Sequence, residues 1–296
     1  MPLPVAVITG AASGIGLETA RRLTRTHQVA LLDIDGEAAE KAAAKLDGAA
    51  VAFRCDITDR ASVAAAVGGV IDRFGTIDVA VSNAGIGTVG AARHLDPDVL
   101  AAVLDVNVTG NWRFIHACLP HLAESRGYLL GVASAAAIFC PPGESMYAAS
   151  KAGLEALLDV VRVEVAQLGI EVGVAYLMFI DTPLVSDGDR EHADLARMRS
   201  MLRGPARKTY PVSMAADALA RGIQRRARQV FVPGSLKYQH LLRGSIKPVI
   251  DREFRRIAPE VDRLSEQKVR ERGSFAAAFN RGTLAAREHR AADGDR

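Results

Sequence analysis

The sequence is poor in the features that mark several classes of protein. Only 5% of its 296 residues are aromatic, and the formal net charge at pH 7 is +3, which indicates no strong field for nucleic acid. The three cysteines, Cys55, Cys118 and Cys140, lie far apart and form no CxxC pair. We therefore expect neither a disulfide framework nor a metal site, and a reducing compartment fits this cysteine content best.

Long apolar runs are also missing. The first ten residues, MPLPVAVITG, lead directly into a β-branched run without the basic and apolar regions of a secretion signal. No uncharged apolar run reaches the length that a bilayer span requires. We therefore expect a cytoplasmic protein that does not bind nucleic acid.

Short apolar runs alternate with helical stretches along most of the chain. The runs predict strands at 5–9, 29–33, 50–56, 77–85, 127–134, 170–176 and 229–233. Among the helices predicted between them, two long ones are expected at about 97–121 and 147–167. Strands that alternate with helices favour the α/β class, with a doubly wound, Rossmann-type parallel sheet.

Two regions fall outside this alternation. Residues 181–212 follow the sixth strand as an insertion, which we interpret as a substrate loop, and residues 236–296 extend the chain beyond the last strand. We assign residues 1–235 to a single catalytic domain. The charge-rich extension is predicted to be partly helical, and its last residues, REHRAADGDR, are predicted to be disordered.

A glycine-rich segment, TGAASGIG, follows the first strand directly. Gly10, Gly14 and Gly16 permit a tight turn and let backbone N–H groups approach a pyrophosphate, and the helix that begins near Ile15 presents its positive N-terminal end. Ser13 stands where a basic residue would receive a 2′-phosphate. Because the segment lies between a strand and a helix, it favours a dinucleotide cradle over a glycine-rich turn without a ligand.

Acidic and small residues end the next three strands. Asp33 can accept hydrogen bonds from the ribose hydroxyls and repel a 2′-phosphate, so we expect NAD rather than NADP as the cofactor. Asp56 is placed to meet the adenine edge. Small residues after the fourth strand would let cofactor and backbone come close, although Asp, Asn and Gly are also common turn residues. The remaining candidates for cofactor contact in this region are Ile57, Asn83, Ala84 and Gly85.

A serine, a tyrosine and a lysine form the candidate catalytic set. Ser134 ends the fifth strand, and Tyr147 and Lys151 lie four residues apart on one face of the next helix. A free tyrosine has a pKa of about 10, and we expect the Lys151 ammonium to lower it, so that Tyr147 exchanges a proton with an alcohol or a carbonyl. Ser134 would hold and polarise the same oxygen. A Tyr-x-x-x-Lys pair alone is more often a surface tyrosine packed on a lysine, so this assignment depends on the dinucleotide loop upstream.

In this order the motifs resemble those of the short-chain dehydrogenases/reductases, in the branch that consists of one compact domain. The resemblance covers residues 3–235 and rests on Thr9-Gly10-x-x-x-Gly14-x-Gly16, Asp56, Asn83-Ala84-Gly85, Asn107, Ser134 and Tyr147-x-x-x-Lys151. It implies an NAD(P)-dependent oxidoreductase whose catalytic residues are Ser134, Tyr147 and Lys151, the last two also contacting the cofactor. It further implies that Asn107 holds a water linking the catalytic lysine to solvent, and that the protein is a homodimer or homotetramer.

The sequence departs from the family pattern at AYLMFIDTPLV, residues 175–185. Leu177 and Met178 replace the Pro-Gly turn that usually follows the sixth strand, whereas Ile180 and Thr182 keep the usual residue types and remain candidates for cofactor contact. Large apolar residues thus gather beside the expected nicotinamide pocket, which suits a small lipophilic substrate. They could equally fill the core or a subunit contact. The candidates for the substrate pocket are Ile138, Phe139, Met178, Phe179 and Leu184.

Three functions agree with these features. The first is an NAD-dependent oxidoreductase that interconverts a secondary alcohol and a ketone on a bulky lipophilic substrate, such as a steroid, a terpenoid or an acyl derivative. The second is a catalytically silent dinucleotide-binding regulator or scaffold of the same fold. The third is an enzyme that contacts an anionic membrane surface through residues 221–256, where ten Lys or Arg and two acids alternate with apolar residues. We favour packing of this segment against protein, because Gly244 and Pro248 are expected to interrupt a continuous helix.

Overall fold

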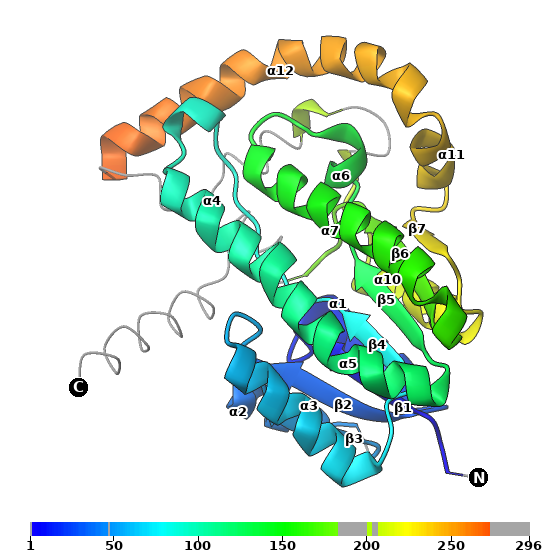
Figure 1. Cartoon of the computed structure of the whole chain (residues 1–296). Helices are drawn as coiled ribbons and strands as arrows, with labels where there is room; N and C mark the ends of the chain where they lie inside the picture. The colour runs from blue at the N-terminus through cyan, green and yellow to red at the C-terminus, as the bar shows by residue number, and fades with distance from the viewer. Residues whose placement is uncertain (1, 47, 183–199, 203–206, 273–296) are drawn as a thin grey trace.

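A parallel sheet forms the centre of the protein. The computed structural model describes residues 2–46, 48–182, 200–202 and 207–272 of the chain. Its seven-stranded sheet has the order β3-β2-β1-β4-β5-β6-β7 (Figure 1). The strands are β1 (Val5–Thr9), β2 (Gln28–Asp33), β3 (Ala50–Arg54), β4 (Val79–Ser82), β5 (Tyr128–Val132), β6 (Glu171–Leu177) and β7 (Gln229–Val232). The strand order reverses direction between β1 and β4, so the predicted doubly wound, Rossmann-type sheet is confirmed.

Helices cover both faces of the sheet because alternate strand residues point to opposite sides. In β1, Val5 and Val7 pack into one hydrophobic core, and Ala6 and Ile8 pack into the other. The first core is closed by α3 (Arg60–Phe74), α5 (Asn111–Ser125) and α7 (Ser145–Glu164), and the second by α1 (Gly14–Leu23), α2 (Gly36–Ala43) and α10 (Val212–Gln224). Shorter elements are η1 (Ala92–His94), α4 (Pro97–Leu104), η2 (Asp105–Gly110), α6 (Ala136–Phe139) and η3 (Ala166–Leu168).

The helix expected at 97–121 is interrupted by a π-helical turn, because α4 passes into η2 before α5 begins. The side-chain amide of Asn111 donates to the carbonyl oxygens of Val106 and Asn107, each at 3.1 Å, and so stabilises the widened turn. Hydrophobic periodicity does not reveal such a turn. π-helical turns are frequent at functional sites, and Asn107, a candidate site residue, lies in this one.

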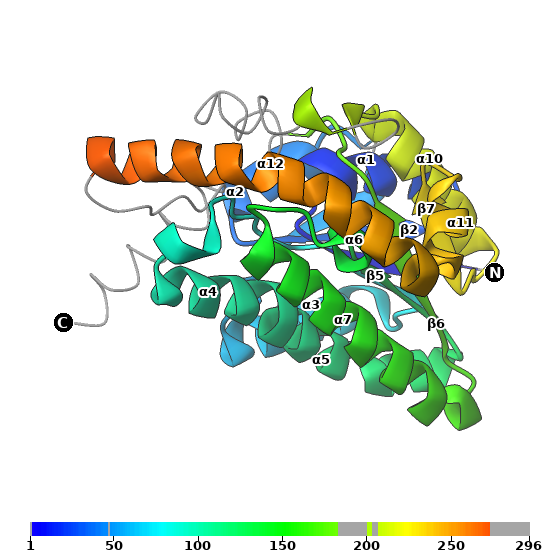
Figure 2. The same cartoon turned by 90° about the horizontal axis from the view of Figure 1, so that it is seen from above.

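Beyond β7 the chain forms α11 (Leu236–Leu241) and α12 (Arg243–Arg272). The prediction that Gly244 and Pro248 interrupt the helix is wrong, because both lie inside α12, which is continuous over 30 residues. Pro248 stands in the second turn, where its missing N–H removes the single bond to the Gly244 carbonyl. Figures 1 and 2 show α12 running over α6 toward η1 on the outside of the molecule.

Some of the sequence predictions fall on residues that the structure does not describe. These are the last residues of the extension, 273–296, and most of the proposed substrate loop, including Leu184. Within the described part of the chain, no helix is both long and apolar enough to cross a membrane.

Gly173 in β6 is tightly enclosed, and its replacement tests the packing of the sheet. A Cβ there would lie 2.2 Å from the Tyr128 hydroxyl oxygen and 2.3 Å from the Ala227 carbonyl oxygen, which are themselves hydrogen bonded to each other at 2.8 Å. We expect Gly173→Ala to lower the free energy of unfolding by about 2 kcal/mol or more, because a backbone atom must move. Urea denaturation measures this loss.

Gly68 supplies the matched control. It lies in α3, and a Cβ there would meet nothing within 4 Å. We expect Gly68→Ala to stabilise the protein by about 0.5–1 kcal/mol, since alanine is the better helix former. Equal effects of the two substitutions would contradict this description of β6.

Candidate active site

A cavity of about 870 Å³ runs along the carboxyl edge of the sheet. The exits of β1 to β6 contribute to it, together with residues of α6, α7, α11 and α12. Most of the residues predicted to contact a cofactor or to act in catalysis line this one cavity. They are Gly10, Ser13, Gly14, Ile15, Asp33, Asp56, Ile57, Asn83, Ala84, Gly85, Ser134, Tyr147, Lys151, Ile180 and Thr182. Two of the predicted residues, Gly16 and Asn107, lie behind its surface.

The glycine loop is shaped by close packing against the exit of β4. A Cβ on Gly10, whose φ is +64°, would lie 3.0 Å from the Ala84 Cα, and one on Gly16 would lie 2.3 Å from the Gly10 carbonyl oxygen. The Asn83 amide fastens the two segments by donating to the carbonyl oxygens of Thr9 at 2.9 Å and Gly10 at 3.2 Å. Asn83 is thus first a structural link of the loop.

The N-terminus of α1 opens on the cavity without a side-chain cap, because the Ser13 hydroxyl bonds to none of its N–H groups. Uncapped N–H groups and the helix dipole favour an anion at this place. Together with the side-chain-free cradle at Gly10, they fit the pyrophosphate of a dinucleotide.

Two carboxylates line the cavity at the ends of β2 and β3. Asp33 accepts hydrogen bonds from the Ala12 N–H at 2.9 Å and the Asp35 N–H at 3.1 Å, so it orders the glycine loop, and burial raises its pKa. Asp56, 4% exposed, accepts bonds from the N–H and the hydroxyl of Thr58 at 2.8 and 2.6 Å. Asp56 is therefore also a turn residue that fixes the exit of β3.

Lys151 is 4% exposed, and its ammonium donates to the Val132 carbonyl oxygen at 2.9 Å. Its Nζ lies 5.8 Å from the centre of the Tyr147 ring. The Ser134 hydroxyl accepts from the Ala136 N–H at 3.1 Å and donates to the Leu177 carbonyl at 3.5 Å, and it lies near enough to Tyr147 to lower the pKa of the phenol. The three predicted catalytic side chains therefore meet at the edge of β5.

The expected lowering of the Tyr147 pKa is wrong for this arrangement. Burial raises the pKa of Tyr147 to about 12 and outweighs the hydrogen bond from Ser134, which lowers it. Burial also lowers the pKa of Lys151 to about 8. Spacing of residues on a helix predicts which charges are neighbours, but it does not predict how far both groups are removed from water.

Asn107, 0% exposed, is held by hydrogen bonds on its side chain. Its Oδ1 accepts from the Ile86 N–H at 2.8 Å, and its Nδ2 donates to the Ile86 carbonyl at 2.8 Å and the Ser150 hydroxyl at 2.9 Å. A Cβ on Gly85 would lie 3.1 Å from Asn107 Oδ1 and 3.3 Å from Lys151 Nζ. Asn107 thus ties the β4 exit to α7 beside the catalytic lysine.

Where the family has a Pro-Gly turn, β6 continues. Leu177 pairs with Val232 in β7 and is 4% exposed, and the Met178 N–H donates to the Val232 carbonyl oxygen at 2.8 Å. Ile180 then forms an isolated bridge with Tyr210, and the Thr182 hydroxyl donates to the Ile180 carbonyl at 3.2 Å. Leu177 therefore extends the strand, and the apolar residues after it turn along the cavity.

The predicted substrate-pocket residues divide into two groups. Phe139, Met178 and Phe179 line the cavity. Ile138 is 6% exposed and packs in the hydrophobic core, because the short helix α6 turns it toward the sheet. Leu184 lies outside the described residues.

The contribution of the C-terminal extension to the cavity was not predicted from the sequence. Helices α11 and α12 also line the cavity, through Gln239, Ile246, Val249, Ile250, Glu253, Phe254 and Ile257. Apolar residues at spacings of three and four were the available signal. They were interpreted as a face that packs against protein, and not as part of the wall of a cavity.

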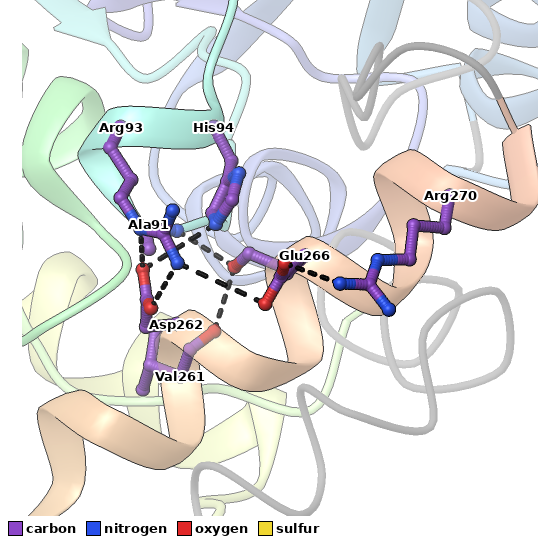
Figure 3. A network of polar contacts seen from close by, with 8 residues as sticks. Ala91, Arg93, His94, Val261, Asp262, Glu266 and Arg270 are labelled. Atoms are coloured by element: carbon purple, nitrogen blue, oxygen red, sulfur yellow. Dashed lines mark hydrogen bonds and ion pairs between the residues drawn. The ribbon is translucent and has the colours of Figure 1, made fainter.

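Two polar anchors hold α12 in place. At its C-terminal half, Arg93 forms a bidentate pair with Asp262, with both N–O distances at 2.6 Å, and the Ala91 N–H donates to the Ser265 hydroxyl at 2.8 Å (Figure 3). At its start, the Arg243 guanidinium donates to the buried Glu155 of α7 at 2.7 Å. Glu155 also accepts from the Tyr176 hydroxyl at 2.8 Å.

Comparisons with known proteins agree with this geometry. The profile of the family described as short chain dehydrogenase matches residues 4–193. The chain is 36% identical over 190 residues to 2-(R)-hydroxypropyl-CoM dehydrogenase of Xanthobacter autotrophicus, covering 61% of this chain and 76% of that protein. It is 34% identical over 223 residues to oxidoreductase UcpA of Escherichia coli, covering 73% of this chain and 84% of UcpA.

Solved structures share the fold. A 3-ketoacyl-(acyl-carrier-protein) reductase from Brucella melitensis, complexed with NADH, has a TM-score of 0.69 and 27% identity, covering 78% of this chain and 97% of that one. A short chain dehydrogenase/reductase from Burkholderia phymatum in complex with NAD has a TM-score of 0.74 at 21% identity, covering 84% of this chain and 95% of that one. The second likeness concerns the fold alone.

The buried charge of Lys151 lowers the stability of the folded protein at neutral pH. Its pKa falls from 10.5 to about 8 on folding, so the folded protein binds this proton more weakly than the unfolded chain, and stability rises between these two pH values. We expect Lys151→Met to stabilise the protein by about 2 kcal/mol at pH 7, with the advantage disappearing as the pH rises from 8 to 10.5. Denaturation at a series of pH values measures the difference.

Lys41 is a suitable control because its side chain is 74% exposed. We expect Lys41→Met to leave the pH dependence of stability unchanged. A Lys151→Met protein that is less stable than wild type at pH 7 would show that the ammonium's bond to Val132 outweighs its desolvation.

Proposed function

The chain belongs to the short-chain dehydrogenase family and is an oxidoreductase of that family acting on hydroxyl groups, and we propose that it interconverts a bulky lipophilic secondary alcohol and its ketone with NAD as the cofactor. The proposal of a lipophilic substrate is supported mainly by the apolar residues that α12 adds to the wall of the cavity. Ile246, Val249, Ile250, Phe254 and Ile257 face the same space as Phe139, Met178 and Phe179. Lipophilic ligands are bound by linings of this kind.

Tyr147 is proposed to move the proton. With its pKa raised to about 12, the phenol is protonated at neutral pH and can donate to a carbonyl oxygen. Ser134, beside it, holds the same oxygen and polarises it. Lys151 fixes the position of the phenol and supplies positive charge when phenolate forms, and Asn107 positions the lysine helix. When bound, NAD or NADH supplies the hydride acceptor or donor.

NAD is proposed over NADP because of Asp33. Its carboxylate lines the cavity at the end of β2 and would repel a 2′-phosphate. The described lining residues of the cavity include a single cation, Lys151, and it lies at the catalytic end. The rest of the proposed cofactor site consists of Gly10 to Gly16, Asp56, Ile57, the Asn83–Gly85 segment, Ile180 and Thr182.

A homodimer or homotetramer is proposed from the outer face of α7. Val160 and Val163 on this helix are 56% and 75% exposed, and Leu168 just beyond it is 46% exposed. Apolar groups gathered on one helix face favour burial against another subunit. A cytoplasmic location is proposed with it, since the buried cysteines Cys55 and Cys118 are free thiols.

Removal of the Tyr147 hydroxyl tests the reaction. We expect Tyr147→Phe to lower kcat by about 100-fold to 10,000-fold on a panel of a 3-hydroxysteroid, borneol, a 3-hydroxyacyl ester and sorbitol, followed by nicotinamide absorbance. Wild type should prefer NAD over NADP and the lipophilic alcohols over sorbitol. Undiminished turnover in Tyr147→Phe would refute the mechanism, and no turnover by wild type with any alcohol would favour the silent scaffold.

Truncation of the α12 wall tests the substrate class. Phe254→Ala removes an aromatic ring from the lining, and we expect the ratio of kcat/KM for borneol over 2-butanol to fall about tenfold. Tyr238→Ala on α11 is the control, because this ring is 69% exposed and lies outside the cavity lining. The same fall in both variants would indicate a general loosening of the extension.

A further inference from the structure

Two polar side chains on the substrate side of the cavity have no bonding partner among the described residues. The hydroxyl of Thr88 lines the cavity at 1% exposure and makes no hydrogen bond. Glu144 lines the same cavity, and its carboxylate neither caps α7 nor accepts a bond from a described residue. Thr88 is buried and Glu144 is half-buried, and a polar group that is removed from water without a partner loses hydration without compensation.

The two side chains belong to adjoining segments of the cavity wall. The Gly90 N–H donates to the Gly143 carbonyl oxygen at 2.8 Å, which joins the loop of Thr88 to the residue before Glu144. The backbone of Glu144 is held on both sides, by its N–H to the Pro141 carbonyl at 3.2 Å and by its carbonyl to the Ala148 N–H at 2.7 Å. Glu144 therefore stands in a fixed place, about one helical turn before Tyr147.

The charge of this wall excludes one class of ligand. Burial raises the pKa of Glu144 to about 7, and no basic side chain of the described lining other than Lys151 is available to compensate its charge. Glu253 of α12 lines the same cavity, but Arg256 pairs with it at 3.1 Å, so the exclusion depends on Glu144. A substrate with a carboxylate or sulfonate at this point would bring like charges together in a poorly hydrated cavity.

We infer that Glu144 and Thr88 form a second recognition point of the substrate pocket, which binds a hydroxyl or ammonium group on an otherwise apolar alcohol. The inference rests on the proposed alcohol oxidation at Tyr147 and adds the substrate's second functional group. The carboxylate accepts the hydrogen bond, and the threonine hydroxyl can accept or donate another. Because Glu144 lies only three residues before Tyr147, a compact 1,4-disubstituted cyclohexane is a suitable probe of the two groups.

Four matched cyclohexanols test this recognition. They carry a methyl, hydroxyl, amino or carboxylate group at the 4-position, and kcat/KM is measured with NAD for wild type, Glu144→Gln and Thr88→Val. Binding of the same compounds in the presence of NADH is measured by calorimetry, so that the ranking does not depend on turnover. Glu164→Gln is the control, because this glutamate lies exposed on the same helix and outside the cavity.

Wild type should favour the amino and hydroxyl compounds over the methyl compound and discriminate against the carboxylate. In Glu144→Gln we expect the preference for amino over carboxylate to fall about 10-fold to 100-fold, the effect of losing a hydrogen bond to a charged group. Thr88→Val should weaken the hydroxyl compound about threefold to tenfold without lowering Tm, because the lost hydroxyl bonds to nothing in the described protein. Glu164→Gln should behave as wild type.

The outcomes separate this inference from the proposed function. Turnover of all four compounds with one ranking in wild type and Glu144→Gln would overturn the inference and leave the oxidoreductase proposal standing. Binding that changes as expected without any turnover would uphold the inference and count against the proposed reaction. Binding of none of the four compounds would also overturn the inference, since a polar contact of this strength would be detectable.

Discussion

The burial of an ammonium group at the edge of β5 is the constraint on which the catalytic end of this protein depends. Lys151 is 4% exposed, and the one hydrogen bond of its ammonium among the described residues, to the Val132 carbonyl, replaces only part of the lost hydration. Gly85 leaves the space, since a side chain there would approach Lys151 Nζ to 3.3 Å. Asn107, in a π-helical turn, joins the β4 exit to the lysine helix. The π-helical turn, Gly85 and the Asn107 amide all help to accommodate this one desolvated charge.

Sequence alone could predict the local parts of this site. The glycine loop, Asp33, and the Tyr147–Lys151 pair depend on strand and helix periods and on turn chemistry, and all of these are encoded within a few residues. The π-helical turn at Asn107 was missed because hydrophobic periodicity does not reveal it, and the continued strand at Leu177 was missed because it depends on a neighbour distant in the chain. Leu177 pairs with Val232, which removes the need for a turn. The raised pKa of Tyr147 was likewise missed, because it follows from burial.

In the C-terminal extension, too, the sequence predicts the local structure but not the tertiary contacts. Its helical character was readable, yet its place over the cavity depends on contacts with residues more than one hundred positions away, such as Arg93 with Asp262. The family profile ends at residue 193, so α12 belongs to the part of the chain that the profile does not cover. The proposed reacting groups come from the part that the profile covers, and several residues of the proposed substrate lining come from beyond it.

The buried Glu155 couples the extension to the body of the fold. One of its oxygens accepts from Tyr176 of β6 and from Arg243 of α12, and His240 of α11 lies 3.3 Å away. A carboxylate of this kind in α7 is costly without its cationic partner. The helix and the glutamate are therefore energetically coupled, and removal of α12 would leave the buried Glu155 carboxylate without its guanidinium partner.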